Sequence, residues 1–172
     1  MGIEFEAKVL DIDVNGIKAA ITDAGAEAMG SVLLRRYVFD IDPGDRSRWI
    51  RLRDEGHRVT LATKHIRNDE IDGTYETEVV VSDFDTTREL LGQLGYQPKS
   101  YQENRRTSYR LGNIHLEIDE WPHIPAYLEI EATSKEEVLQ AAQRIGITEQ
   151  QLTAKNTTDV YGLYGIDIST MS

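Results

Sequence analysis

Charged and apolar residues alternate along much of this chain, a pattern typical of β-strands that present one polar and one apolar face. Near the N-terminus, Glu4, Glu6 and Lys8 alternate with Phe5 and Ala7, so their charged side chains would share one face of a strand. The same period of two, interrupted by turn sequences, predicts eight strands: residues 3–12, 34–42, 46–54, 57–66, 74–82, 105–111, 113–120 and 126–132.

The two signs of charge are segregated between these strands. Arg51 and Arg53 occupy one strand, whereas Glu76 and Glu78 occupy another. Two carboxylates about 7 Å apart on a strand can flank a hard divalent cation, and a lysine one step further can hold an anion. The N-terminal strand therefore has the layout of a metal-phosphate site, although a solvated strand face of mixed charge has the same spacing.

Apolar residues at helical spacing, with a capping residue near the start of each segment, predict four helices. They are residues 14–28 with Asn15 as the cap, 86–94 with Asp85 as the cap, a helix beginning at Ser134 with Glu137 in its capping box, and a short helix after Thr148 with Gln151. No linker rich in proline, glycine or serine divides the chain, so we expect one domain over residues 1–172.

These elements predict an α+β fold, in which an eight-stranded antiparallel β-barrel has a charged interior and helices packed outside it. A closed sheet of eight strands leaves an interior wide enough for side chains or for one small ligand. Because buried charges without partners are costly, we expect this tunnel to bind both an anion and a cation.

Composition narrows the chemistry. The chain has 28% charged and 40% hydrophobic residues, as globular proteins do, and it lacks a long apolar run or a basic leader, so we expect no membrane span, no signal peptide and a cytoplasmic location. The absence of cysteine excludes thiolate metal sites and favours hard cations with oxygen ligands. A net charge of −11 argues against general nucleic-acid binding.

Five motifs in a fixed order carry a family resemblance. They are Glu4-x-Glu6-x-Lys8, Arg51-x-Arg53, the lysine strand that ends at Lys64, Glu76-x-Glu78 with the later Arg106, and Asp119 followed by Glu129-x-Glu131. Over nearly the whole chain this order resembles the CYTH superfamily of triphosphate tunnel metalloenzymes, which includes class IV adenylyl cyclases, thiamine triphosphatases and bacterial inorganic triphosphatases.

Two positions depart from the family pattern. Asn104 stands where the family commonly has a lysine, so one phosphate-binding cation is missing or is replaced by Arg105. The C-terminal motif, roughly Lys-Ser-Tyr, retains Lys155 and the acidic and apolar positions that follow.

The resemblance implies roles for the charged residues. The phosphate-binding residues would be Lys8, Arg51, Arg53, Lys64, Arg106 and Lys155; the ligands of Mg²⁺ or Mn²⁺ would be Glu4, Glu6, Asp119, Glu129 and Glu131; and the catalytic residues would be Glu4, Glu6 and Lys8. The competing interpretation is a set of salt bridges on solvated strand faces. For Glu76 and Glu78, metal or base chemistry and simple pairing with the arginines both stay open.

Hydrolysis of a triphosphate and cyclisation of ATP need the same clamp, so these residues do not separate them. A triphosphatase is favoured because the sequence gives no evident base-specific pocket; Trp49, Trp121, Tyr37 and Tyr127 could stack on a base but are more often core residues. A class IV adenylyl cyclase is the alternative, and a non-catalytic polyphosphate-binding or nucleotide-binding module is a second one. The expected ligands are tripolyphosphate, ATP or thiamine triphosphate, with no nucleic acid and no membrane; a homodimer stays open.

Overall fold

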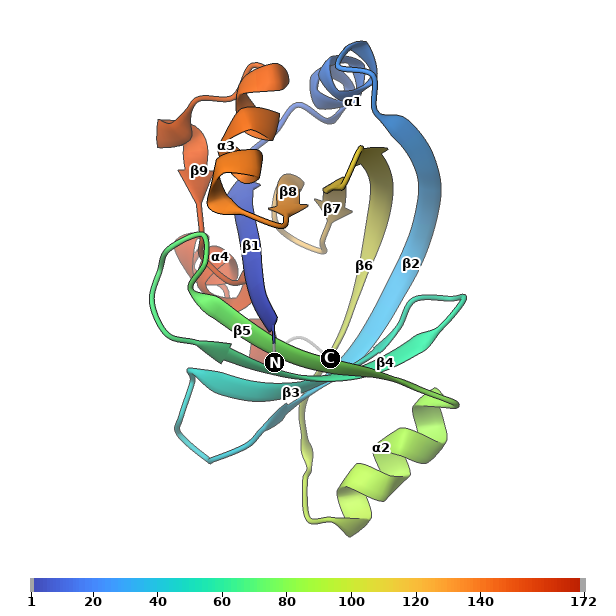
Figure 1. Ribbon diagram of the computed structural model, residues 1–172. Coiled ribbons are helices and arrows are strands. Elements are labelled where there is room, and N and C mark those ends of the chain that lie inside the picture. Colours follow the sequence, from blue (N-terminus) through green and yellow to red (C-terminus); the bar gives the residue numbers. More distant parts are fainter. Residues whose placement is uncertain (1, 171–172) are drawn as a thin grey trace.

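Eight antiparallel strands close into a barrel in the computed structural model, which describes residues 2–170 (Figure 1). The strands are β1 (Gly2–Val9), β2 (Glu27–Asp40), β3 (Arg48–Asp54), β4 (Val59–Ile66), β5 (Thr74–Val81), β6 (Pro98–Leu111), β7 (Ile114–Glu120) and β8 (Tyr127–Ala132). Their order is β5-β4-β3-β2-β6-β7-β8-β1, and β1 pairs back onto β5 from Gly2 to Glu4. The predicted α+β barrel is therefore confirmed.

The strand β1 divides its free edge between two partners. Its first residues pair with β5, whereas Lys8 and Val9 pair with the short strand β9 (Leu152–Thr153). Between these pairings, the backbone N–H of Glu6 donates to the carbonyl of Ile71 in the loop before β5 (3.0 Å). A loop and a late segment of the chain thus complete the wall where β1 and β5 diverge.

Helices surround the barrel. They are α1 (Val14–Asp23), α2 (Phe84–Gln93), α3 (Lys135–Arg144) and α4 (Thr157–Leu163), with 3₁₀ turns at Glu149–Gln151 and Ile168–Thr170. The capping box at Thr148 and Gln151 and the cap at Ser134 form as predicted. In the other two helices the cap lies two residues earlier than expected, because Asp13 and Asp83 accept the N–H groups of the first turn.

Two strands begin well before their predicted starts. The expected helix over 14–28 ends at Asp23, because Gly25 has φ of 86° and reverses the chain; residues 27–28 already belong to β2. Likewise β6 begins at Pro98 rather than at residue 105. These long segments pair with each other, so their strand conformation depends on partners about 70 residues apart in the sequence.

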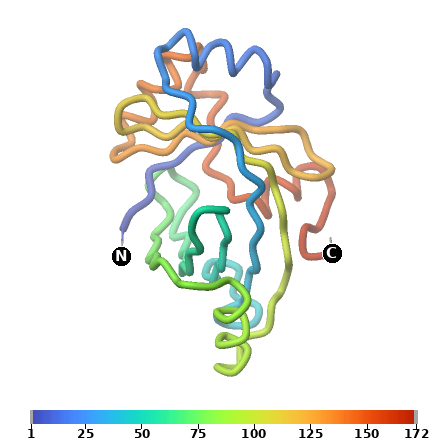
Figure 2. The backbone as a smooth tube through the Cα atoms, turned by 90° about the vertical axis from the view of Figure 1, so that its right-hand side faces the viewer, coloured from blue at the N-terminus to red at the C-terminus, as the bar shows by residue number. Residues whose placement is uncertain are grey.

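The apolar core lies outside the barrel, between strands and helices. One cluster packs Ile21 of α1 and Val138 of α3 against β1, β7 and β8. A second packs Phe84 and Leu91 of α2 against β2 and β3, and Figures 1 and 2 both place α1 and α2 at opposite ends of the molecule. Because side chains alternate along a strand, the residues between these apolar ones face the lumen.

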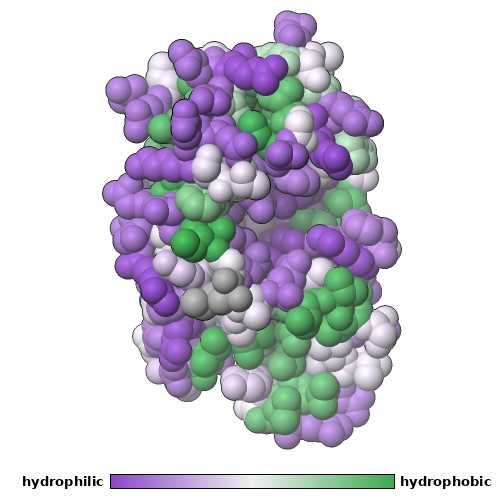
Figure 3. All heavy atoms as spheres, in the orientation of Figure 1, coloured by the Kyte–Doolittle hydropathy of each residue, from purple (hydrophilic) through white to green (hydrophobic). Residues whose placement is uncertain are grey.

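Large hydrophobic residues also reach the surface. They include Val79 and Val80 at the end of β5 and Leu90 and Leu94 in and after α2. In the orientation of Figure 1, Figure 3 shows an apolar patch in the lower part of the molecule, where α2 lies. The upper part of the same view is mostly hydrophilic. None of the helices between residues 2 and 170 combines the length and the apolarity that a bilayer crossing needs.

Candidate active site

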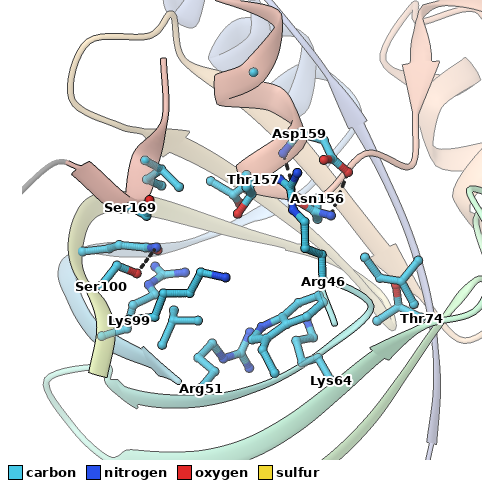
Figure 4. Close-up of a pocket in the computed structure, with 18 of the residues that line it drawn as sticks. Arg46, Arg51, Lys64, Thr74, Lys99, Ser100, Asn156, Thr157, Asp159 and Ser169 are labelled. Carbon is cyan, nitrogen blue, oxygen red and sulfur yellow. Dashed lines mark hydrogen bonds between the residues drawn. The ribbon is translucent and has the colours of Figure 1, made fainter. Parts of the chain in front are cut away.

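The interior of the barrel holds a cavity of about 790 Å³ whose wall is rich in charged side chains. Figure 4 shows Arg51 and Lys64 on the barrel wall, with Lys99 and Arg46 on other sides of the same cavity. The cavity is lined by cations and carboxylates from six strands and by the C-terminal segment, notably Glu6, Lys8, Arg36, Arg51, Arg53, Lys64, Lys99, Arg106, Glu129, Asn156 and Thr157. The strand motifs separated in sequence thus meet around one space.

Arg51 and Arg53 enter this space from β3 because they alternate with Leu52, which packs outside against α2. The Nη2 atom of Arg51 lies 2.7 Å from Glu76 Oε1 and 3.1 Å from Glu78 Oε2. Arg53 pairs with Glu55 at the end of the β3–β4 hairpin. Glu76 and Glu78 both pair with Arg51, as one of their two predicted roles requires.

Lys8 is almost fully buried between carboxylates. Its Nζ atom lies 3.2 Å from Glu129 Oε2 and 3.5 Å from Glu6 Oε1. Burial lowers the pKa of Lys8, but the charges of Glu6 and Glu129 outweigh burial and raise it above the ordinary value. This ammonium is therefore charged at neutral pH.

Arg106 binds Asp119 through a two-pronged contact. Its Nε atom donates to Asp119 Oδ1 (2.8 Å) and its Nη2 atom to Asp119 Oδ2 (2.6 Å), while Nη2 also reaches Glu129 Oε1 (3.2 Å). Asp119 is fully buried and accepts a third hydrogen bond from Asn104 Nδ2 (2.8 Å). This network fixes the arginine fork on the cavity wall.

The predicted metal ligands lie on the neighbouring strands β1, β7 and β8. Glu6 and Glu131 are register partners, and Glu129 is the partner of Lys8. Within residues 2–170, no three acidic or histidine side chains already form a metal cluster. Each of Glu6, Glu129 and Asp119 instead contacts a cation, and Glu4 Oε2 lies 2.9 Å from Lys64 Nζ.

The donor chemistry of these carboxylates nevertheless fits a hard divalent cation. Burial raises the pKa of Glu4 to about 8, against the opposing charge of Lys64. Burial also raises the pKa of Glu131, and the charges of Glu129 and Glu6 add to the effect. Crowded carboxylates that resist ionisation are stabilised by a hard cation such as Mg²⁺ or Mn²⁺, which prefers oxygen ligands.

Two charged residues on the inner faces of the strands were not assigned to the site from the sequence. Glu117 lies beside Asp119 on the inner face of β7; burial raises its pKa to about 7 despite the opposing charge of Arg106. Arg36 lines the cavity from β2, where Arg35 and Arg36 are adjacent and the sequence alone does not tell which one points inward. Register pairing of Arg36 with Arg53 assigns it to the inner face.

Not every predicted phosphate-binding residue reaches the cavity. Lys155 is exposed and does not line it, because the chain turns into α4 and presents Asn156 and Thr157 instead. Arg105 is also exposed, on the outer face of β6. It therefore does not replace the cation that Asn104 lacks.

The aromatic residues divide between wall and core. Trp49, Trp121 and Tyr127 line the cavity, and the hydroxyl of Tyr127 contacts that of Thr157 (3.1 Å). Tyr37 stacks on Phe84 outside the barrel (5.4 Å between ring centroids) and is a core residue. An indole on the wall gives an organic group of a ligand a surface on which to stack.

Comparison with known proteins supports this architecture. The sequence profile of the CYTH domain matches residues 2–164. Among solved structures, the PH1012 protein of Pyrococcus horikoshii OT3 is 24% identical, with a TM-score of 0.77 and an alignment that covers 90% of this chain and 96% of that one. No protein of curated function matches the sequence.

Two further similar structures carry functional descriptions of their own. A candidate adenylate cyclase of Vibrio parahaemolyticus is 15% identical, with a TM-score of 0.77 and coverage of 93% of this chain and 98% of that one. HpAC1 of Hippeastrum, a candidate adenylyl cyclase described as having a dominant triphosphatase activity, is 16% identical, with a TM-score of 0.60 and coverage of 96% of both chains. At these identities the likeness establishes the shared fold alone.

Proposed function

Because this chain belongs to the CYTH family, we propose that it is a metal-dependent enzyme acting on triphosphates, and specifically a triphosphatase. One observation carries the proposal: Lys8, Arg51, Arg53, Lys64 and Arg106 surround the same cavity as Glu6 and Glu129. A site that holds a polyanion needs the cations, and carboxylates beside them supply the oxygen ligands that a divalent metal ion needs.

The basic side chains would bind and orient the substrate. Arg51, Arg53 and Arg106 have planar forks that match phosphate oxygens, whereas Lys8 and Lys64 act as point charges. Phosphoryl transfer needs charge neutralisation and alignment of nucleophile and leaving group, so fixed cations around the triphosphate supply most of what the reaction requires. The buried network of Arg106 and Asp119 keeps one such cation in place before the substrate arrives.

The carboxylates would hold the metal ion. Glu4, Glu6, Asp119, Glu129 and Glu131 supply oxygen donors of the kind that Mg²⁺ and Mn²⁺ prefer. When bound, the ion polarises phosphoryl oxygens and offsets their charge. Glu6 lies beside Lys8 on β1, so one strand would contact both metal and phosphate, which is why these two residues and Glu4 are assigned to catalysis.

A class IV adenylyl cyclase is the second candidate. Trp49 on the cavity wall favours it, since the indole could hold a base in one pose while a triphosphate occupies the clamp. The cavity volume lies in the range of sites for drug-sized organic ligands. Hydrolysis requires only an oriented water, however, and the triphosphatase activity described for HpAC1 is consistent with that simpler reaction on this fold.

Phosphorus NMR of the products distinguishes these functions. The protein is incubated with tripolyphosphate, ATP or thiamine triphosphate and with Mg²⁺ or Mn²⁺; Arg53→Ala is the matched control. We expect the wild-type protein to release orthophosphate from at least one substrate. After a chelator has removed the metal ion, no orthophosphate should form, and Arg53→Ala should release little. Cyclic AMP with pyrophosphate would instead identify a cyclase. Binding without turnover under any of these conditions would refute the enzyme and leave a polyphosphate-binding or nucleotide-binding module.

A further inference from the structure

Arg36 differs from the other cations on the inner faces of the barrel strands because it forms no ion pair within residues 2–170. Its side chain is buried, with 7% of the residue exposed, and its Nε atom has no hydrogen-bond partner in that range. One Nη atom donates to Asn104 Oδ1, and the guanidinium lies 4.7 Å above the ring of Trp121. By contrast, each of the other five inward cations pairs with a carboxylate: Lys8, Arg51, Arg53, Lys64 and Arg106.

The surroundings of Arg36 are positive. Burial, followed by the charges of Arg53 and Arg51, lowers the pKa of Arg36 to about 9, so the guanidinium remains charged at neutral pH. A buried charge without a counter-ion is costly, and an aromatic ring beneath it compensates only in part. A purely structural arginine would gain by pairing, whereas one that binds an anionic ligand has to keep donors free.

The position of Arg36 also accounts for a departure from the family pattern. Asn104 stands where a lysine is common, and Arg105 points away from the cavity. The side chain of Asn104 is neutral and both accepts and donates hydrogen bonds: Oδ1 accepts from Arg36, and Nδ2 donates to Asp119. An asparagine here holds the incoming guanidinium, whereas a lysine would repel it.

We propose that Arg36 is a substrate-binding residue that supplies, from β2, the phosphate-binding cation that Asn104 does not provide. Its free guanidinium N–H groups donate to oxygens of one phosphoryl group of the triphosphate. This inference rests on the proposed function, because it names a further ligand-binding residue of the same site. It also predicts that one cation on the inner face of the strands finds its counter-ion only in the ligand.

The test measures tripolyphosphate binding by calorimetry without divalent metal, so that hydrolysis does not intervene. Arg36→Met should weaken binding by about tenfold or more, the usual effect of losing a hydrogen bond between charged groups. Arg35→Met is the matched control: Arg35 is the neighbouring residue, pairs with Asp54 (2.9 Å) and lies over Phe84 outside the barrel. It should bind within about twofold of wild type.

Moving the charge gives a second readout. In the Arg36→Met background, Asn104→Lys places an ammonium at the position that the family commonly uses, and it should recover most of the lost affinity. Thermal unfolding of Arg36→Met should occur at or above the wild-type midpoint, because an unpaired buried charge is removed. A merely structural arginine would give neither the rescue nor the retained stability.

The contrary results separate the two proposals. If Arg36→Met binds tripolyphosphate like wild type while Arg53→Ala does not, Arg36 is not a ligand-binding residue and the proposed function stands. A clear loss of stability in Arg36→Met would likewise overturn the inference, since it would mean that the native fold depends on this charge. If wild type binds no tripolyphosphate with or without Mg²⁺, the proposed function itself fails.

Discussion

Replacing Arg106 with methionine should destabilise the protein strongly. Arg106 is the partner of fully buried Asp119, with contacts of 2.8 and 2.6 Å, and of Glu129 at 3.2 Å. Methionine fills similar space but leaves Asp119 without its cation, whereas Glu129 keeps Lys8. Breaking a buried pair in this way costs about 3 to 5 kcal/mol. For a chain of this size, that corresponds to a melting temperature lower by roughly 6 to 20 °C.

The assay is urea and thermal unfolding followed by circular dichroism at neutral pH, without metal or phosphate. Two variants test the reasoning. Asp119→Asn combined with Arg106→Met should recover much of the loss, because the unpaired carboxylate is removed, whereas Arg36→Met alone should show no loss. A wild-type midpoint for Arg106→Met, or equal losses for Arg106→Met and Arg36→Met, would show that pairing does not set the stability of these buried charges.

Three further outcomes are expected. Glu6→Gln should raise the metal concentration for half-maximal activity and lower kcat by roughly 10²-fold, since a ligand charge is lost; unchanged metal dependence would exclude Glu6 as a ligand. Arg53→Ala should raise KM, and lower kcat as well if the phosphate charge it meets grows in the transition state; wild-type kinetics would remove it from the clamp. Because burial raises the pKa of Glu4 from 4.5 to about 8, the folded state holds this proton more tightly, so stability from Glu4 is complete below about pH 4.5 and is lost as pH rises through about 8. The melting temperature of the metal-free protein should therefore fall as pH rises over this range. In Glu4→Gln, the part of this fall that comes from Glu4 should be absent.

Much of the barrel follows from the alternation of residues within each strand. The alternation of Arg51 and Arg53 with the apolar Ile50 and Leu52, together with the turn sequences, was sufficient to place both arginines on one face of a strand. This is possible because the alternation of side chains along a strand is a local property. The starts of β2 and β6 were not predictable in this way. Residues 27–33 carry glycine, methionine and alanine with little alternation, and their strand conformation is stabilised by pairing with residues 105–110.

The candidate site shows the same division between local and non-local information. The order of the motifs was sufficient to nominate the clamp, but the adjacent Arg35 and Arg36 are equivalent until the register with β3 is known. Lys155 lies next to Asn156, which lines the cavity, and one residue decides between inside and outside at a helix start. Geometry of this kind depends on packing of α4 against Tyr127 and Trp121, which single-sequence reasoning does not supply.

The structure also changes the electrostatic argument made from the sequence. Segregation of charge by strand suggested that the lumen must contain ions, yet strands of opposite sign lie close enough for their side chains to pair over an intervening strand, as Arg51 of β3 does with Glu76 of β5 on the two sides of β4. Most of the charge on the wall is thus neutralised by ion pairs within the protein. In these pairs, phosphate oxygens could replace the carboxylates as partners of the basic side chains, and a metal ion could replace the basic side chains as the partner of the carboxylates. Arg36 is the stronger evidence for a bound anion, because it is buried without an ion pair to any carboxylate within residues 2–170. Pairing Arg36 with a carboxylate would make the protein more stable but would oppose the binding of a phosphate there, so at this residue stability and ligand binding conflict most directly.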